Sequence, residues 1–144
     1  MAKQIFVNLP VKDLNKSVEF FTKLGYEFNP QFTDENATCM IIGENIFAML
    51  LVEKFFQTFT SKQIADAHKT AEVLLCVSED SRNAVNAHVD KALEAGGTIA
   101  NQPQDHGWMY SRSYSDLDGH IWEVMYGDME ELNRMMAEQG AQTA

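Results

Sequence analysis

One carboxylate stands out because it lies within an apolar run near the end of the chain. Glu123 follows the turn-forming pair Asp118-Gly119 and is flanked by Trp122 and Val124. An Asp-Gly pair is typical of tight turns, and the alternating residues after it predict a strand. A carboxylate on such a strand can bind a hard cation or transfer a proton, so Glu123 is a candidate acid or base. The alternative is a partly solvated sheet residue without chemistry.

A second pattern with chemical potential runs from Trp108 to Tyr114. Its alternate residues form two sets, Trp108, Tyr110, Arg112 and Tyr114 against Met109, Ser111 and Ser113. In a strand these sets lie on opposite faces. The set with the aromatic rings and Arg112 predicts one of two arrangements. It lines a cavity for a planar or anionic molecule, or it packs under helices with Arg112 paired.

The histidines do not form a group with the spacing of a metal site. His120 comes directly after the Asp-Gly turn, where we expect it to position that turn rather than to bind a metal. His106 precedes Gly107 in a polar loop, which we expect at the rim of a pocket. Surface positions are expected for His68 and His88. Motifs of nucleophilic catalysis, such as G-x-S-x-G and C-x-x-C, are absent from the sequence.

Charge and hydropathy narrow the classes of partner. The 144 residues carry a formal net charge of −10. This charge argues against nucleic acid and anionic membranes, because phosphate contacts need clustered Lys and Arg. The sequence has no apolar run long enough to span a bilayer and no signal-peptide segment at its start. Cys39 and Cys76 lie in apolar runs and are expected to be buried free thiols. We therefore expect a cytoplasmic protein.

The elements that must position these residues recur in two sets. Each set has the order βαβββ, with a helix that follows an N-capping side chain and stops at glycine. The first set is predicted as a strand at 4–9, a helix from Asp13 to Gly25, and strands at 26–33, 37–42 and 46–52. The second is predicted as a strand at 72–77, a helix from the caps at 78–80 to Gly96, and strands at 98–102, 108–115 and 120–126.

The predicted fold class is α+β, with two βαβββ modules at about 4–54 and 70–127 in a single domain spanning 1–144. A connector at 55–69 joins the modules, and a short helix is expected after Ser61. A C-terminal helix is expected after 128, capped by Asp128 with Glu131 at the capping-box position. Each curved sheet leaves a concave face, which is a natural site for a ligand.

With this order of elements, the chain resembles the vicinal oxygen chelate superfamily. This superfamily includes glyoxalases (lactoylglutathione lyases), bleomycin resistance proteins and extradiol dioxygenases. The resemblance covers about residues 4–127 and rests on four segments: V-N-L-P-V-K-D-L at 7–14, F-F-T-K-L-G at 20–25, residues 80–97, and D-L-D-G-H-I-W-E at 116–123. It implies that the modules form a cupped mixed sheet around a divalent metal, and that the protein is a homodimer.

The resemblance also implies where metal ligands would lie, on the first and fourth strands of each module. Carried onto this sequence, those positions are Phe6 and Ala48 in the first module and Glu72 and Glu123 in the second. Phe6 and Ala48 cannot coordinate a metal. A tightly bound transition metal is therefore not expected. Any metal would be a weakly bound divalent ion such as Mg²⁺, held by Glu72, Glu123 and water.

The cup implied by the resemblance is expected to bind a small-molecule ligand. The candidate ligand-binding residues are Phe6, Asn8, Ala48, Tyr110 and Arg112. We expect Phe6, Asn8, Glu72 and Glu123 to face one cavity, with Leu74 and Cys76 on the same side. Three functions are open at this point: a metal-assisted lyase, isomerase or dioxygenase, a metal-free binding or sequestering protein of the bleomycin-resistance type, and a dimer without a ligand. The missing ligands of the first module favour the second function, and the two glutamates keep the first.

Overall fold

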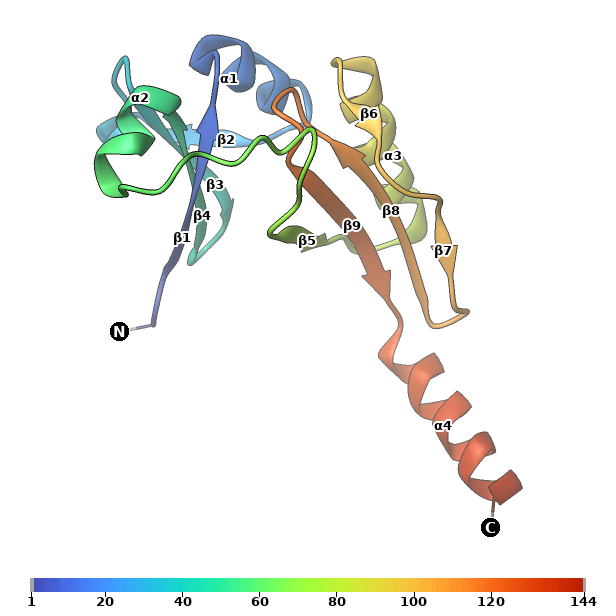
Figure 1. Ribbon diagram of the computed structural model, residues 1–144. Coiled ribbons are helices and arrows are strands. Elements are labelled where there is room, and N and C mark those ends of the chain that lie inside the picture. The colour runs from blue at the N-terminus through green and yellow to red at the C-terminus, as the bar shows by residue number, and fades with distance from the viewer. Residues whose placement is uncertain (1, 144) are drawn as a thin grey trace. The chain divides into compact units, whose positions relative to one another are not determined.

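The computed structural model describes residues 2–143, with side chains up to residue 140. The chain forms two compact units, each built around one sheet (Figure 1). Unit 1 comprises Met1–Ala71 and Leu117–His120, and unit 2 comprises Glu72–Asp116 and Ile121–Ala144. The short loop Leu117–His120 therefore belongs to unit 1, although the strands on either side of it belong to unit 2. The predicted α+β class is confirmed.

Unit 1 has the predicted βαβββ order, followed by a short helical segment. Its elements are β1 (Ile5–Val11), α1 (Leu14–Lys23), β2 (Glu27–Asn29), the 3-10 turn η1 (Pro30–Phe32), β3 (Ala37–Gly43), β4 (Ile46–Val52), α2 (Glu53–Phe56) and the 3-10 turn η2 (Gln57–Phe59). The sheet order is β1-β4-β3-β2, with β1 parallel to β4 and the other pairs antiparallel.

Two predictions for unit 1 need correction. The predicted strand at 26–33 ends at Asn29, because Pro30 starts η1 and the Asn29 side chain accepts a hydrogen bond from the Gln31 backbone. The helix expected after Ser61 is wrong, because the helical turns of the connector, α2 and η2, come before that residue. The α1 prediction is confirmed, since the Asp13 carboxylate accepts the Lys16 N–H at 3.1 Å and Gly25 follows the helix with φ +102°.

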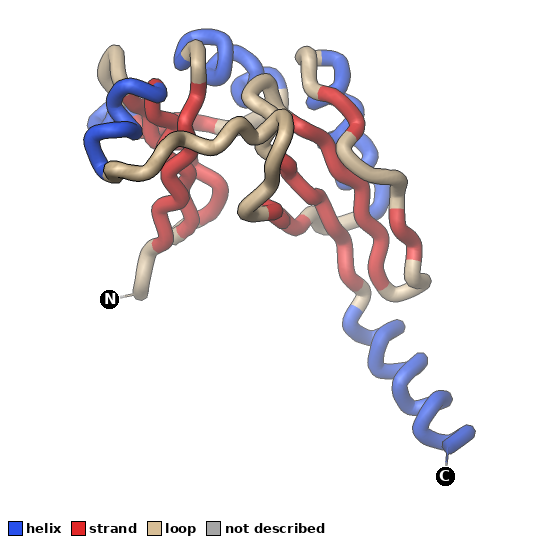
Figure 2. The backbone as a smooth tube through the Cα atoms, viewed as in Figure 1, coloured by secondary structure: helices blue, strands red, loops and turns tan. Residues whose placement is uncertain are grey.

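Unit 2 repeats the pattern with one additional short strand; its long strands and helices are distinguished by colour in Figure 2. Its elements are β5 (Leu74–Ser78), α3 (Arg82–Glu94), β6 (Thr98–Ile99), β7 (Gln104–Asp105), β8 (Met109–Ser115), β9 (Ile121–Gly127) and α4 (Met129–Thr143). The sheet order is β5-β9-β8-β6, and β7 also pairs with β8. The first strand thus starts at Leu74 and not at residue 72. The predicted strand at 98–102 ends at Ile99, and the additional strand β7 follows at Gln104–Asp105.

Of the two helices of unit 2, α3 has a different capping residue from the one predicted, and α4 has the predicted one. Ser81, and not the residues at 78–80, caps α3, because its hydroxyl accepts the Ala84 N–H at 3.0 Å. At α4 the prediction is confirmed, since the Asp128 carboxylate accepts the Glu131 N–H at 3.1 Å. Within residues 2–143, we find no helix with the length and apolar character needed to cross a membrane.

Each sheet has one face packed against its helix and one face turned away from it. In unit 1 the helix-side face includes Leu9, Ala48 and Leu50, which are at most 4 % exposed, and α1 contributes the buried Phe20 and Phe21. In unit 2 the buried helix-side residues are Val85, Val89 and Ala92 of α3 with Tyr114, Trp122 and Val124 of the sheet. The opposite faces are where candidate ligand-binding residues remain accessible.

Candidate functional site

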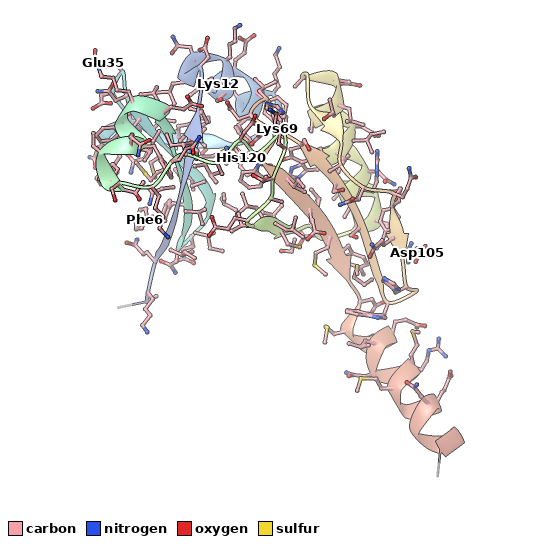
Figure 3. The ribbon with its side chains drawn as sticks, viewed as in Figure 1. Phe6, Lys12, Glu35, Lys69, Asp105 and His120 are labelled. Carbon is pink, nitrogen blue, oxygen red and sulfur yellow. The ribbon has the colours of Figure 1, made fainter. Side chains whose placement is uncertain are left out.

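The open face of unit 1, defined here by Phe6, Asn8, Phe47 and Met49, presents aromatic surface to solvent. Register pairs Phe6 with Phe47 and Asn8 with Met49 on the parallel strands β1 and β4. The two phenyl rings are stacked, with centroids 4.9 Å apart and planes 15° from parallel. Phe6 keeps 45 % of its surface exposed. Figure 3 labels this residue. An exposed ring stacked on a half-buried one offers a flat apolar platform.

The structure places Ala48 on the other face of this sheet. Ala48 is fully buried and pairs with Val7, one residue out of phase with Phe6. Because side chains alternate across a strand, a shift of one residue moves a side chain to the opposite face. On β4, the side chains of Phe47, Met49 and the buried Leu51 lie on the open-face side, so Met49 takes the place that was predicted for Ala48. Burial therefore matches Ala48 with Trp122 of unit 2, not with Glu123, and the predicted ligand-binding role of Ala48 loses its basis.

The open face of unit 2, defined by Cys76, Ser113, Glu123 and Met125, combines a carboxylate with a thiol. Register places Glu123 between Cys76 of β5 and Ser113 of β8. Burial of the thiol, with a smaller contribution from the charge of Glu123, raises the pKa of Cys76. A thiol with a raised pKa stays protonated, which makes it a weak nucleophile. Cys76 is exposed, contrary to expectation, whereas Cys39 is buried as expected.

Glu72 lies outside the strand that was predicted to contain it. It is exposed and precedes the start of β5 by two residues. Leu74 and Cys76 do lie on the same face as Glu123, as predicted, because Leu74 pairs with Ile121 and Cys76 with Glu123. The predicted common cavity for Phe6, Asn8, Glu72 and Glu123 involves both units and stays a prediction.

The alternating run in β8 turns its aromatic set toward α3. The Tyr110 hydroxyl donates to the Asn86 amide oxygen at 2.7 Å, and Arg112 donates to Asp90 at 2.9 Å. Tyr114 on the same side is fully buried. Of the two predicted arrangements, packing under a helix with Arg112 paired is the one observed. Tyr110 and Arg112 therefore fasten α3 to its sheet, and their role in ligand binding stays a prediction.

Of the histidines, His88 has a different environment from the one predicted. His88 is not on the surface but 9 % exposed, with its Nδ1 at 3.7 Å from the Glu79 carboxylate and its Nε2 at 3.4 Å from the Tyr114 hydroxyl. Desolvation lowers the pKa of His88, and the charge of Glu79 opposes that shift. His120 positions the turn as predicted, because its Nε2 donates to the Pro10 carbonyl at 2.8 Å.

Metal-ligating side chains do not converge anywhere in the described part of the chain. Among residues 2–143, no three His, Cys, Asp or Glu side chains are arranged so that they could hold a metal ion. The open face of unit 1 offers one amide, Asn8, and the open face of unit 2 offers Glu123 and the protonated Cys76. These donor sets do not fit the tightly held divalent metal of the resembling enzymes.

Comparisons with known proteins agree with this architecture. The family described as "Bleomycin resistance protein-like N-terminal" matches residues 3–43. A comparison with curated protein sequences found no match. Among solved structures, a hypothetical protein from S. aureus is 27 % identical and superposes with a TM-score of 0.75, covering 88 % of this chain and 94 % of that one.

Two further solved structures connect the fold to described families. A glyoxalase/bleomycin resistance protein/dioxygenase family enzyme from Burkholderia phytofirmans has a TM-score of 0.73 at 15 % identity, covering 88 % of this chain and 99 % of that one. The fosfomycin resistance protein from Mesorhizobium loti has a TM-score of 0.66 at 13 % identity, covering 91 % of this chain and 97 % of that one. At these identities the likeness concerns the fold.

Two βαβββ units, each with a first strand parallel to its fourth, define a glyoxalase/bleomycin resistance/dioxygenase fold. The chain has this fold, and its residues 3–43 match the bleomycin resistance protein-like family, in agreement with the predicted resemblance to the vicinal oxygen chelate superfamily. This superfamily includes both enzymes and resistance proteins, so the activity must be argued from the residues of the open faces.

Proposed function

We propose that this protein is a metal-independent small-molecule-binding protein of the bleomycin-resistance type. Its ligand carries a planar aromatic group that stacks on the open face of unit 1. The observation that carries the proposal is the exposed ring of Phe6, which stacks parallel on the half-buried Phe47 and stands where the resemblance places a metal ligand. A phenyl ring contributes no lone pair to a metal, but it provides surface for another ring.

Three further observations support binding rather than metal-assisted catalysis. The family match to bleomycin resistance proteins covers β1, which carries Phe6. The metal-ligating residues of the described chain do not form a site. The formal net charge of −10 favours a cationic ligand, because the field of the protein raises the local concentration of positive molecules. A planar aromatic group joined to a cationic tail, as in bleomycin, satisfies both requirements.

Calorimetric titration of metal-free bleomycin into the purified chain, after removal of metals with EDTA, tests the proposal. The unaltered chain should bind, and Phe6→Ala and Phe47→Ala should each weaken the affinity about tenfold, since a stacked ring contributes about 1.5 kcal/mol beyond its area. Phe32→Ala is the matched control, because Phe32 is also exposed, at 58 %, but lies in η1 and outside the open face.

The control variant should retain the affinity of the unaltered chain within twofold. Equal losses of affinity in Phe6→Ala and Phe32→Ala would show that the open face is not the binding site. An unaltered chain that does not bind bleomycin would refute the proposed ligand class.

We also propose that the chain acts as a homodimer, as the superfamily resemblance implies. Sedimentation equilibrium giving a monomer at micromolar concentration would contradict that second statement.

A further inference from the structure

Unit 1 contains a cavity of about 250 Å³ that does not include the residues of the open face. Its walls come from the end of β1, the start of α2, the connector at 64–68, and the loop Leu117–His120. Figure 3 labels Lys12 and His120, which both line it. Its volume lies just below the range of about 300–1,000 Å³ that holds drug-sized ligands. A smaller molecule is therefore the appropriate size of occupant.

The wall formed by the Leu117–His120 loop is held in place by several contacts. One Asp118 oxygen accepts the Lys12 backbone N–H at 2.9 Å, and the other accepts the Ser17 hydroxyl at 3.4 Å. The His120 ring donates to the Pro10 carbonyl at 2.8 Å. Gly119, at φ +87°, lets the connector approach closely, since an added Cβ would lie 2.7 Å from the His68 backbone nitrogen. The cavity is thus preformed rather than dependent on a ligand.

The charged side chains at the cavity have both signs. Lys12 supplies an ammonium group, and Glu53 and Asp66 supply carboxylates. The Asp118 carboxylate already accepts two hydrogen bonds from the protein, so it is less suited to hold a ligand. One Asp66 oxygen likewise accepts the His68 N–H at 3.0 Å. This leaves Lys12 and Glu53 as the charged pair best placed to recognise a ligand that carries both charges.

The remaining lining residues are His68, His120 and four apolar residues. Pro10, Ile64, Ala65 and Ala67 line the cavity between the charged groups. A ligand that contacts both parts of the cavity would have two opposite charges and a short apolar side chain. We infer that this cavity is a second binding site, for a zwitterion of the size of an apolar amino acid, with the carboxylate toward Lys12 and the ammonium toward Glu53. The inference is independent of the proposed aromatic ligand on the open face.

The probe for this site is L-leucine, and its binding is detected by two-dimensional ¹H–¹⁵N NMR of the full chain. Leucine should shift the backbone signals of Ala65, Ala67 and Gly119 in a saturable manner. Leucinamide lacks the carboxylate and 4-methylpentanoate lacks the ammonium, so each should bind at least tenfold more weakly. The Lys12→Met and Glu53→Gln chains should also bind leucine about tenfold more weakly. Lys12→Met preserves the backbone N–H that holds Asp118.

Glu44→Gln is the matched control, because Glu44 lies in the turn between β3 and β4 and does not line the cavity. It should bind leucine within twofold of the unaltered chain, as should Phe6→Ala. The inference is overturned if leucine causes no saturable shift, if leucinamide or 4-methylpentanoate binds as well as leucine, or if Lys12→Met and Glu53→Gln both retain full affinity. Loss of bleomycin binding in Phe6→Ala with leucine binding retained would separate this site from the open face.

Discussion

Replacing Gly119 by alanine should destabilise the protein far more than replacing Gly25. Both glycines have positive φ angles, +87° at Gly119 and +102° at Gly25, so alanine is strained at either position. Their surroundings differ, however. A Cβ at Gly25 would meet nothing within 4 Å, whereas one at Gly119 would lie 2.7 Å from the His68 backbone nitrogen and 2.8 Å from the Ala67 carbonyl carbon. Backbone atoms cannot move aside as the end of a flexible side chain can.

The expected magnitudes follow from these two contributions. The left-handed conformation costs alanine about 1–2 kcal/mol at each site. The steric overlap at Gly119 adds about 1–3 kcal/mol, as for other overpacked positions, because the connector must shift away from the loop. Gly119→Ala should thus lower the free energy of unfolding by about 2–5 kcal/mol and Gly25→Ala by about 1–2 kcal/mol. For a chain of this length the melting temperatures should fall by roughly 2–4 °C per kcal/mol.

Urea denaturation followed by far-ultraviolet circular dichroism measures both free energies. The difference between the two variants isolates the steric contribution, since the backbone strain is common to both. If Gly119→Ala proves no more destabilising than Gly25→Ala, the close approach of the connector to the Leu117–His120 loop would be refuted. The preformed wall of the unit 1 cavity would then lose its main support.

Three further predictions concern the sites. Because burial lowers the pKa of His88, the folded chain binds a proton at this ring less readily than the unfolded chain does. The His88 contribution to stability should therefore be present above about pH 6.5 and decline below it. Urea denaturation of the unaltered chain and His88→Gln from pH 5.5 to 7.5 should show their stability difference shrinking as the pH falls, and a difference that grows would contradict this prediction. Arg112→Ala should lower stability by about 1 kcal/mol through loss of the Asp90 and Asn86 contacts, while calorimetry should find bleomycin affinity unchanged within twofold, and a tenfold loss would return Arg112 to the ligand site. Elemental analysis after chelator dialysis should find no stoichiometric Zn, Ni or Fe, and one equivalent of any of these metals would overturn the metal-independent account.

Elements governed by local chemistry were predictable from the sequence. Asp13 and Gly25 bound the first helix through a side-chain cap and a positive φ angle, which depend on only a few neighbouring residues. The strand at 46–52 was predicted with the bounds it has. The α3 cap was placed too early, because Ser78, Asp80 and Ser81 are all capping residues and only tertiary packing selects among them.

The faces of the strands were harder to predict. Ala48 was matched with Glu123 through the isoleucines at 46 and 121, and this alignment is one residue out of phase with the burial of Ala48 and Trp122. A slip of one residue exchanges the two faces of a strand. Phe47 and Met49 were missed as open-face residues for the same reason. The clue was available in the alternation of β4, whose small or branched residues at 48 and 50 could have been assigned to the helix side.

Contacts between distant parts of the chain were beyond the reach of sequence patterns. The two sides of β8 each mix polar and apolar residues, so the alternation alone did not reveal that Tyr110 and Arg112 face α3. The burial of His88 depends on Tyr114 and Glu79, which lie on other elements. The cavity of unit 1 depends on the docking of a loop more than a hundred residues away from Lys12.

The most direct test of a ligand on the open face of unit 1 is NMR of the chain with ¹³C-labelled methionine methyl groups. Met49 lies on the open face beside Asn8, whereas Met40 is fully buried on the helix side of the same sheet and serves as an internal reference. Titration with metal-free bleomycin should shift the Met49 methyl signal in a saturable manner and leave the Met40 signal in place. A Met49 signal that does not move while bleomycin binds, or equal shifts of both signals, would contradict binding at this face.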